Sequence, residues 1–66
     1  MNYKELPDKE LLRQTRQNYG ISQVEMASRM GYSTKYAVLD VEKGRKKLSG
    51  PARKLLEILY KRSQKS

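Results

Sequence analysis

The sequence predicts an all-helical domain of four short helices. Apolar residues recur every three or four positions through four segments, glycine or proline lies at the ends of those segments, and no segment alternates apolar and polar residues as a strand would. A chain of 66 residues is long enough for one domain. We expect that domain to cover residues 1–66, with flexible ends at 1–7 and 63–66.

The first helix is expected over residues 8–19. Asp8 follows Pro7 and suits a helix N-terminus, because its carboxylate can accept hydrogen bonds from the free amides there. The helical spacing then runs through Leu11, Leu12, Thr15, Arg16 and Tyr19. Gly20 follows and predicts the end of the helix.

The second helix is expected over residues 23–30. Ser22 and Glu25 have the spacing of a capping box, in which each side chain bonds an amide of the other residue. One side of this helix carries apolar residues, namely Val24, Ala27 and Met30, with Met26 beside them. Gly31 predicts the end of the helix.

The third helix is expected over residues 34–43, with Ser33 or Thr34 as its cap and Gly44 as its stop. The fourth helix is expected over residues 50–62. It is expected to begin beside Ser49 and Pro51. Proline has no backbone N–H, and an N–H in the first helical turn has no partner within the helix, so proline loses no hydrogen bond there. Its broad apolar stripe comprises Ala52, Leu55, Leu56, Ile58 and Leu59.

The composition excludes several kinds of chemistry. The chain has no Cys and no His, so we expect no disulfide, no structural zinc and no cofactor. Its carboxylates at Asp40, Glu42 and Glu57 lack the spacing of an acid and base pair in a cleft, and we expect no enzymatic activity. No apolar run approaches the roughly 20 residues that cross a bilayer, and the N-terminus lacks the apolar centre of a signal peptide. We therefore expect a cytoplasmic protein, in a bacterium or in a phage-infected host cell, with no membrane partner.

The net charge of +8 is concentrated in the second half of the chain. Residues 1–33 hold five Lys and Arg against four Asp and Glu, whereas residues 34–66 hold ten against three. Such asymmetry indicates an anionic partner, with nucleic acid first and an anionic membrane or an acidic protein next. A solvated basic surface that aids solubility is the alternative.

The segment YGISQVEMASRMGYSTKYAVLDVEKGRKK contains two short predicted helices joined by a tight turn. It resembles the DNA-binding domain of phage Cro and repressor proteins and of their bacterial Xre-type relatives. The residues that match the family in order are Gly20, Ile21, Gln23, Glu25, Ala27, Gly31, Glu42 and Gly44. The resemblance covers about residues 9–59 and implies a compact four-helix, lambda-repressor-like domain with a helix-turn-helix.

One interval departs from the family pattern. The stretch Gly31–Gly44 is one residue longer than usual. If the family positions are counted back from Gly44, Val38 and Val41 fall in the core. If they are counted forward from Gly31, Asp40 would be buried, which costs free energy unless the carboxylate is paired. We therefore place the extra residue in the turn at residues 32–33.

The resemblance implies a role for individual residues. The residues expected to face base edges are Lys35, Tyr36, Ala37 and Asp40. Those expected to contact DNA phosphates are Gln23, Thr34, Lys43, Arg45, Lys46, Lys47 and Ser49. Arg16 and Glu42 match a family salt bridge that joins the first helix to the end of the third. These residue types suit the task, because Lys can donate to guanine, Asp can accept from cytosine and Ala can touch a thymine methyl group.

The sequence thus predicts a sequence-specific double-stranded DNA-binding transcriptional regulator, a small phage or bacterial repressor that binds a palindromic operator as a homodimer. Leu56, Tyr60 or the segment around Tyr3 could form the dimer surface. An alternative is an antitoxin-type module that binds a protein partner, such as a toxin or a regulator, and represses its own operon. A module that bridges proteins, or binds RNA without reading bases, is a third possibility.

For some single residues, an interpretation without any role in binding also stays open. Lys35, Lys46 and Lys47 could be solvated charges, and Tyr36 could cover the edge of the core.

Overall fold

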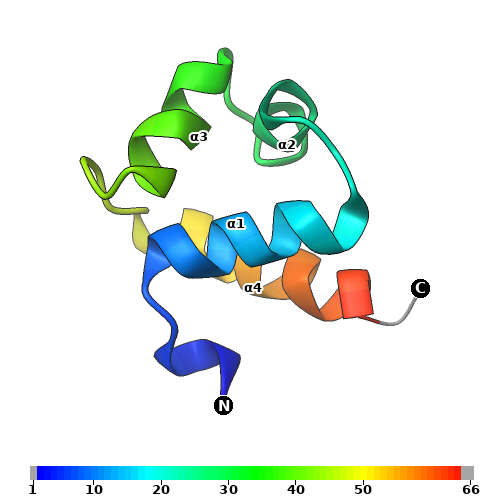
Figure 1. Ribbon diagram of the computed structural model, residues 1–66. Helices are drawn as coiled ribbons and strands as arrows, with labels where there is room; N and C mark the ends of the chain where they lie inside the picture. The colour runs from blue at the N-terminus through cyan, green and yellow to red at the C-terminus, as the bar shows by residue number, and fades with distance from the viewer. Residues whose placement is uncertain (1, 65–66) are drawn as a thin grey trace.

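Five helical segments follow one another along the part of the chain that the computed structural model describes, residues 2–64 (Figure 1). They are the 3-10 helix η1 (Tyr3–Glu5) and the α-helices α1 (Asp8–Tyr19), α2 (Gln23–Arg29), α3 (Lys35–Glu42) and α4 (Gly50–Gln64). Residues 2–64 contain no strand. The all-helical prediction is confirmed, and the four predicted helices end within two residues of the observed bounds.

Helices α2 and α3 end in the same kind of turn. After α2, the amide of Gly31 bonds the carbonyl of Ser28 at 3.1 Å, and the amide of Tyr32 bonds the carbonyl of Ala27 at 2.8 Å. These two bonds form a Schellman motif, which requires a left-handed residue between them. Gly31 has φ 77° and meets this requirement without strain, because it has no Cβ.

The helix starts match the prediction in part. Ser22 Oγ accepts from the Glu25 amide at 3.2 Å, which confirms one half of the capping box, but the Glu25 carboxylate accepts from Arg29 at 3.4 Å. At the start of α4, Ser49 Oγ accepts from the Ala52 amide at 3.3 Å. Thr34 precedes α3 without forming a side-chain capping bond.

The prediction that Asp8 caps α1 with its carboxylate is wrong. Pro7 occupies the cap position, and α1 begins without a side-chain capping bond. The Asp8 carboxylate accepts from Leu48 and Arg53 instead, far along the chain. The sequence pattern predicted the start of the helix correctly. The Asp8 carboxylate, however, accepts from Leu48 and Arg53 and not from the free amides of α1.

Helix α1 lies in the middle of the molecule, with α4 packed on one side and α3 on the other (Figure 1). Helix α2 packs on α3. The buried apolar residues come from all four α-helices and are Leu11, Leu12, Met26, Ala27, Met30, Val38, Val41, Leu56 and Leu59. The buried hydroxyl of Thr15 donates to the Leu11 carbonyl at 2.7 Å, so this polar group does not disturb the core.

Val24 departs from the predicted pattern, because its side chain is 61% exposed. The buried residues of α2 are Met26 and Ala27, and Met30 is buried directly after the helix. Gln23 lies three residues before Met26 and therefore on the same side of the helix. Val24 lies about 100° further around the helix axis than Gln23 and points away from that side. The polar residue therefore takes the inward position that the sequence suggested for valine.

The N-terminal residues make contacts that the sequence did not predict. Arg53 Nη2 donates to the carbonyls of Tyr3 at 3.2 Å and Lys4 at 3.3 Å, and the ring of Tyr3 lies 5.5 Å from that of Tyr60. At the other end, α4 continues to Gln64. Residues 1, 65 and 66 of the predicted flexible ends lie outside the described residues.

Leu56 is fully buried, which excludes it from a dimer surface. Its place in the stripe of α4 that packs on α1 is the reason.

Candidate functional site

The orientation of α3 is fixed by polar contacts at its last residue, Glu42. This carboxylate is buried, and it accepts from Arg16 Nε at 2.9 Å and Arg16 Nη2 at 3.2 Å. It also accepts from Gln23 Nε2 at 3.3 Å, while Arg13 Nη2 donates to the Glu42 carbonyl at 3.0 Å. The ion pair expected between Arg16 and Glu42 is present, and donors from both α1 and α2 meet at the end of α3.

The outward side of α3 carries Tyr36 and Asp40, and Lys43 continues this side directly after the helix ends at Glu42. Val38 and Val41 face the core on the opposite side, at 0% and 4% exposure. The structure thus agrees with the register that buries the valines and leaves Asp40 accessible. We call Tyr36, Asp40 and Lys43 the outer ridge of α3. No side chain of this ridge forms a hydrogen bond within the described residues.

The other two residues predicted to read bases lie beside this ridge. Lys35 is exposed, and its Nζ lies 5.8 Å from the centre of the Tyr36 ring. Ala37 is half-buried on the other flank of the helix. Tyr36 is 61% exposed, so its ring is not covered by the core.

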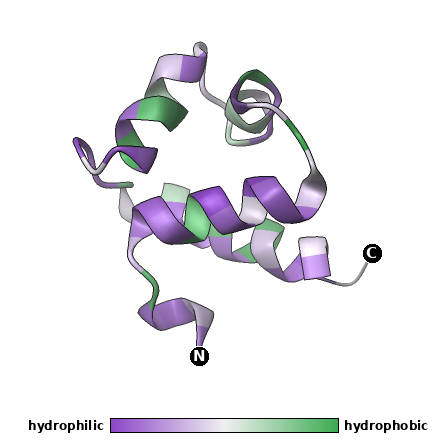
Figure 2. Ribbon diagram, in the orientation of Figure 1, coloured by the Kyte–Doolittle hydropathy of each residue, from purple (hydrophilic) through white to green (hydrophobic). Residues whose placement is uncertain are grey.

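A Schellman motif turns the chain at the end of α3 into the basic loop, which we define as residues 43–47. The amide of Gly44 bonds the carbonyl of Val41 at 3.0 Å, and the amide of Arg45 bonds the carbonyl of Asp40 at 2.8 Å. Gly44 has φ 79°, the conformation that this turn requires. The loop therefore stays beside the end of α3, and Figure 2 shows hydrophilic residues at both ends of α3 and along this loop.

The predicted phosphate-contacting residues lie at the two ends of α3. Thr34 is exposed at the start, and Lys43, Arg45, Lys46 and Lys47 are exposed beyond the end. Gln23 joins the second group through its bond to Glu42. Ser49 is exposed at the start of α4, and its oxygen already accepts from the Ala52 amide.

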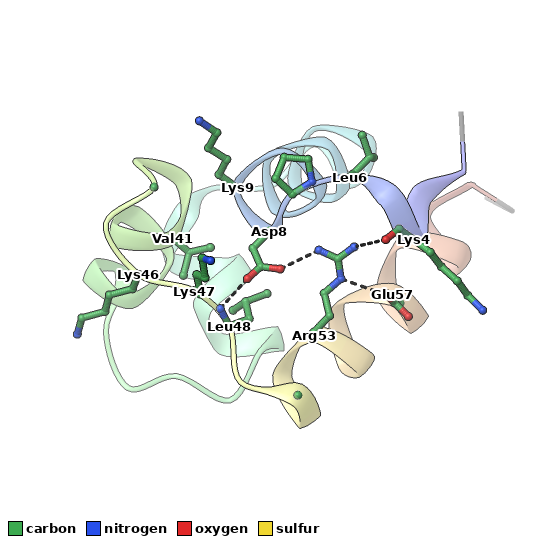
Figure 3. A pocket seen from close by; sticks show the side chains of 13 residues that line it. Lys4, Leu6, Asp8, Lys9, Val41, Lys46, Lys47, Leu48, Arg53 and Glu57 are labelled. Carbon is green, nitrogen blue, oxygen red and sulfur yellow. Dashed lines mark hydrogen bonds and ion pairs between the residues drawn. The ribbon is translucent and has the colours of Figure 1, made fainter.

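Behind the basic loop, a polar network connects α1, α4 and the N-terminal segment (Figure 3). Asp8 Oδ2 accepts from the Leu48 amide at 2.8 Å, and Asp8 Oδ1 accepts from Arg53 Nη1 at 2.7 Å. Arg53 Nε also donates to Glu57 at 3.0 Å. Burial opposes the charge of Arg53, but hydrogen bonds and charges from Asp8 and Glu57 outweigh burial and raise the pKa of Arg53. The guanidinium is therefore charged wherever the protein is folded.

This network borders an open pocket of about 730 Å³. Its apolar lining includes Leu6, Val41 and Leu48. Figure 3 shows Lys4, Lys9 and Lys46 at its rim with their ammonium groups pointing away from it. Arg53 engages the carboxylates of the pocket, and the ammonium groups of Lys4, Lys9 and Lys46 point away from it, so these groups do not surround a ligand.

Two basic residues near the loop were missed in the sequence. Lys9 and Arg13 of α1 line a hollow of about 560 Å³ together with Lys43 and Arg45. Residues 1–33 are almost neutral as a whole, which hid these two cations in the charge count. The exposure of Val24 at the start of α2 was likewise not expected.

Residues 2–64 contain no cluster of three or more acidic side chains that could hold a metal ion. No helix in the same part of the chain is both long and apolar enough to cross a bilayer.

Comparison of the chain with protein-family models, with curated proteins and with solved structures gave no match.

Proposed function

We propose that this protein is a sequence-specific double-stranded DNA-binding regulator of transcription, in which α2 and α3 form the helix-turn-helix of a lambda-repressor-like domain. The observation that carries the proposal is the outer ridge of α3. Tyr36 and Lys43 are exposed and Asp40 is half-buried, none of the three side chains forms a hydrogen bond within residues 2–64, and the basic loop begins at Lys43. A helix with one buried side and one unengaged side suits entry into a groove.

The dimensions of α3 support this proposal. An α-helix with its side chains is about 10–12 Å across, which matches the width of about 12 Å of the major groove. With α3 in the groove, Tyr36 and Asp40 face base edges, joined by Lys35 and by Ala37 at the flank. The basic loop then lies along the backbone, where Lys46 and Lys47 contact phosphates without reading sequence.

The contacts at Glu42 have a clear purpose in such a complex. Reading base edges requires a fixed angle between α3 and the rest of the domain, and hydrogen bonds are directional. Arg16 and Gln23 supply that constraint, one from α1 and one from α2.

The regulator binds a palindromic operator as a homodimer, because two reading helices about 34 Å apart meet successive major grooves on one face of DNA. It represses by occupying a promoter and needs no catalytic step. With Leu56 buried, the dimer either uses other residues or forms only on DNA.

The first test is selection of duplexes from a random library, followed by fluorescence anisotropy on the selected duplex and on a scrambled one. We expect at least about a thousandfold preference for the selected duplex at physiological salt. Uniform, weak and strongly salt-dependent binding to both duplexes would contradict base reading and favour the alternatives.

A second test separates the two kinds of contact. Tyr36→Ala and Asp40→Ala should change which duplexes the selection enriches, by about 1–3 kcal/mol for each base that is read. Val24→Ala, which removes an exposed residue of α2 outside the assigned contacts, is the matched control and should enrich the wild-type duplexes. Unchanged preferences in both variants would remove the outer ridge from the reading surface.

A further inference from the structure

Helix α4 carries a second basic surface that the proposed DNA site does not use. Its buried stripe is formed by Leu56, Leu59 and Ser63. Turned away from this stripe lie four exposed residues, Lys54, Ile58, Lys61 and Arg62, which we call the α4 outer face.

Ile58 is the apolar residue of this face and is 50% exposed. It extends a ridge that includes Pro51 and the half-buried Leu55 at spacings of seven and three residues. A single exposed apolar side chain is common on proteins. The informative feature is its position between three cations on one helix.

The charges of the face are not balanced within the helix. Glu57 is the one carboxylate of residues 50–64, and Arg53 engages it at 3.0 Å. Lys61 is exposed, with its Nζ 5.4 Å from the centre of the Tyr3 ring, and Tyr3 and the carboxylate of Glu57 raise the pKa of Lys61. The outer face therefore presents three positive charges around an apolar centre.

This face lies away from the surface assigned to DNA. Helix α3 and α4 are on different sides of α1 (Figure 1). Ile58 is also about 12 Å along the helix axis from Gly50, which lies three residues after the end of the basic loop. A partner on the outer face can therefore be bound while α3 remains free.

A second copy of the chain does not fit this surface. In a two-fold dimer the same patch meets itself, so Lys54, Lys61 and Arg62 would face like charges with no opposing carboxylate. A partner with acidic residues around an apolar side chain is complementary in both respects.

We propose that the α4 outer face binds an acidic segment of another protein, with an apolar side chain of the partner seated on Ile58. This interaction is independent of DNA binding, so either proposal can fail alone.

The test uses the full chain labelled with ¹⁵N and a defined probe, an 18-residue helical peptide with leucines on one side and glutamates elsewhere. A scrambled peptide of the same composition is the control for bulk charge. We expect saturable shifts of amide resonances at residues 54–62, weaker shifts with the scrambled peptide, and unchanged peptide affinity in the presence of duplex DNA.

Variants identify the face directly. Ile58→Ser should weaken peptide binding about tenfold, as removal of a central contact does, and Lys54→Glu combined with Lys61→Glu at least as much. Lys46→Ala, in the basic loop, should leave it unchanged. Thermal melting verifies that each variant is folded, which is expected because all the altered residues are exposed.

Four results would overturn the proposal. They are equal binding of the scrambled peptide, shifts confined to the basic loop, binding to phosphatidylglycerol vesicles that needs Ile58 while peptide binding does not, and a dimer in sedimentation that Ile58→Ser dissociates. The third would make the face a membrane surface, and the fourth would make it a self-association surface.

Discussion

Helices α3 and α4 pack against α1 from different sides, and different forces hold them. Helix α4 is held chiefly by a stripe of buried leucines, whereas the end of α3 is held by the charged and amide groups around Glu42. Apolar burial is strong but non-directional, while hydrogen bonds constrain angle. The comparison suggests that α4 supplies most of the stability and that Glu42 supplies the orientation of α3.

The largest effect is expected from Leu56→Ala. This side chain is fully buried, and its truncation should lower the free energy of unfolding by about 3 kcal/mol. Urea denaturation followed by circular dichroism measures the loss. Ile58→Ala on the same helix is the matched control, and its half-exposed side chain should cost well under half as much. Equal losses would mean that α4 is not held by its buried stripe.

Arg53→Met tests whether polar contacts of α4 also contribute to the stability of the fold. The variant removes bonds to Asp8, Glu57 and two backbone carbonyls, and the expected loss of stability is about 2 kcal/mol. Urea denaturation measures it, with Lys54→Met as the exposed neighbour for comparison. If both variants behaved alike, the network behind the basic loop would contribute nothing to stability.

Glu42→Gln keeps the shape of the side chain but removes its charge, leaving Arg16 without a charged partner. We expect a loss of about 1–2 kcal/mol in stability. Under conditions where the variant is folded, anisotropy should show at least a tenfold loss of affinity for the selected duplex, because the angle of α3 is no longer fixed. Wild-type affinity would show that packing of Val38 and Val41 sets this angle by itself.

The smallest effect is expected from Lys46→Ala, which should leave stability unchanged. DNA affinity should fall to a similar degree for all duplexes, and the dependence of log affinity on log salt should decrease by about one ion. Lys61→Ala, an exposed cation on α4, is the matched control and should change neither quantity. A change of base preference in Lys46→Ala would mean that the loop reads sequence.

The sequence predicted those parts of the structure that depend on neighbours along the chain. Glycines mark the ends of α1, α2 and α3, and the need to keep Asp40 out of the core gave the correct register for α3. Val24 was misplaced, since in a helix of seven residues the apolar pattern is too short to fix which side is buried.

Most contacts between segments far apart in the chain could not be predicted from the sequence. Arg53 bonds residues 45 to 50 positions away, and no periodicity in the sequence records such a pairing. The pair Arg16 and Glu42 was anticipated only through the family resemblance. Lys9 and Arg13 were missed because a charge count follows the chain, whereas the cationic surface is assembled in space.

The outer ridge of α3 has a practical consequence. Because the side chains of Tyr36, Asp40 and Lys43 form no hydrogen bonds within residues 2–64, these three positions can be randomised together while the scaffold is retained. Under the proposed function, a library of that kind would retarget the domain to new duplexes, with Glu42, Arg16 and Gln23 left unchanged to keep the angle of α3.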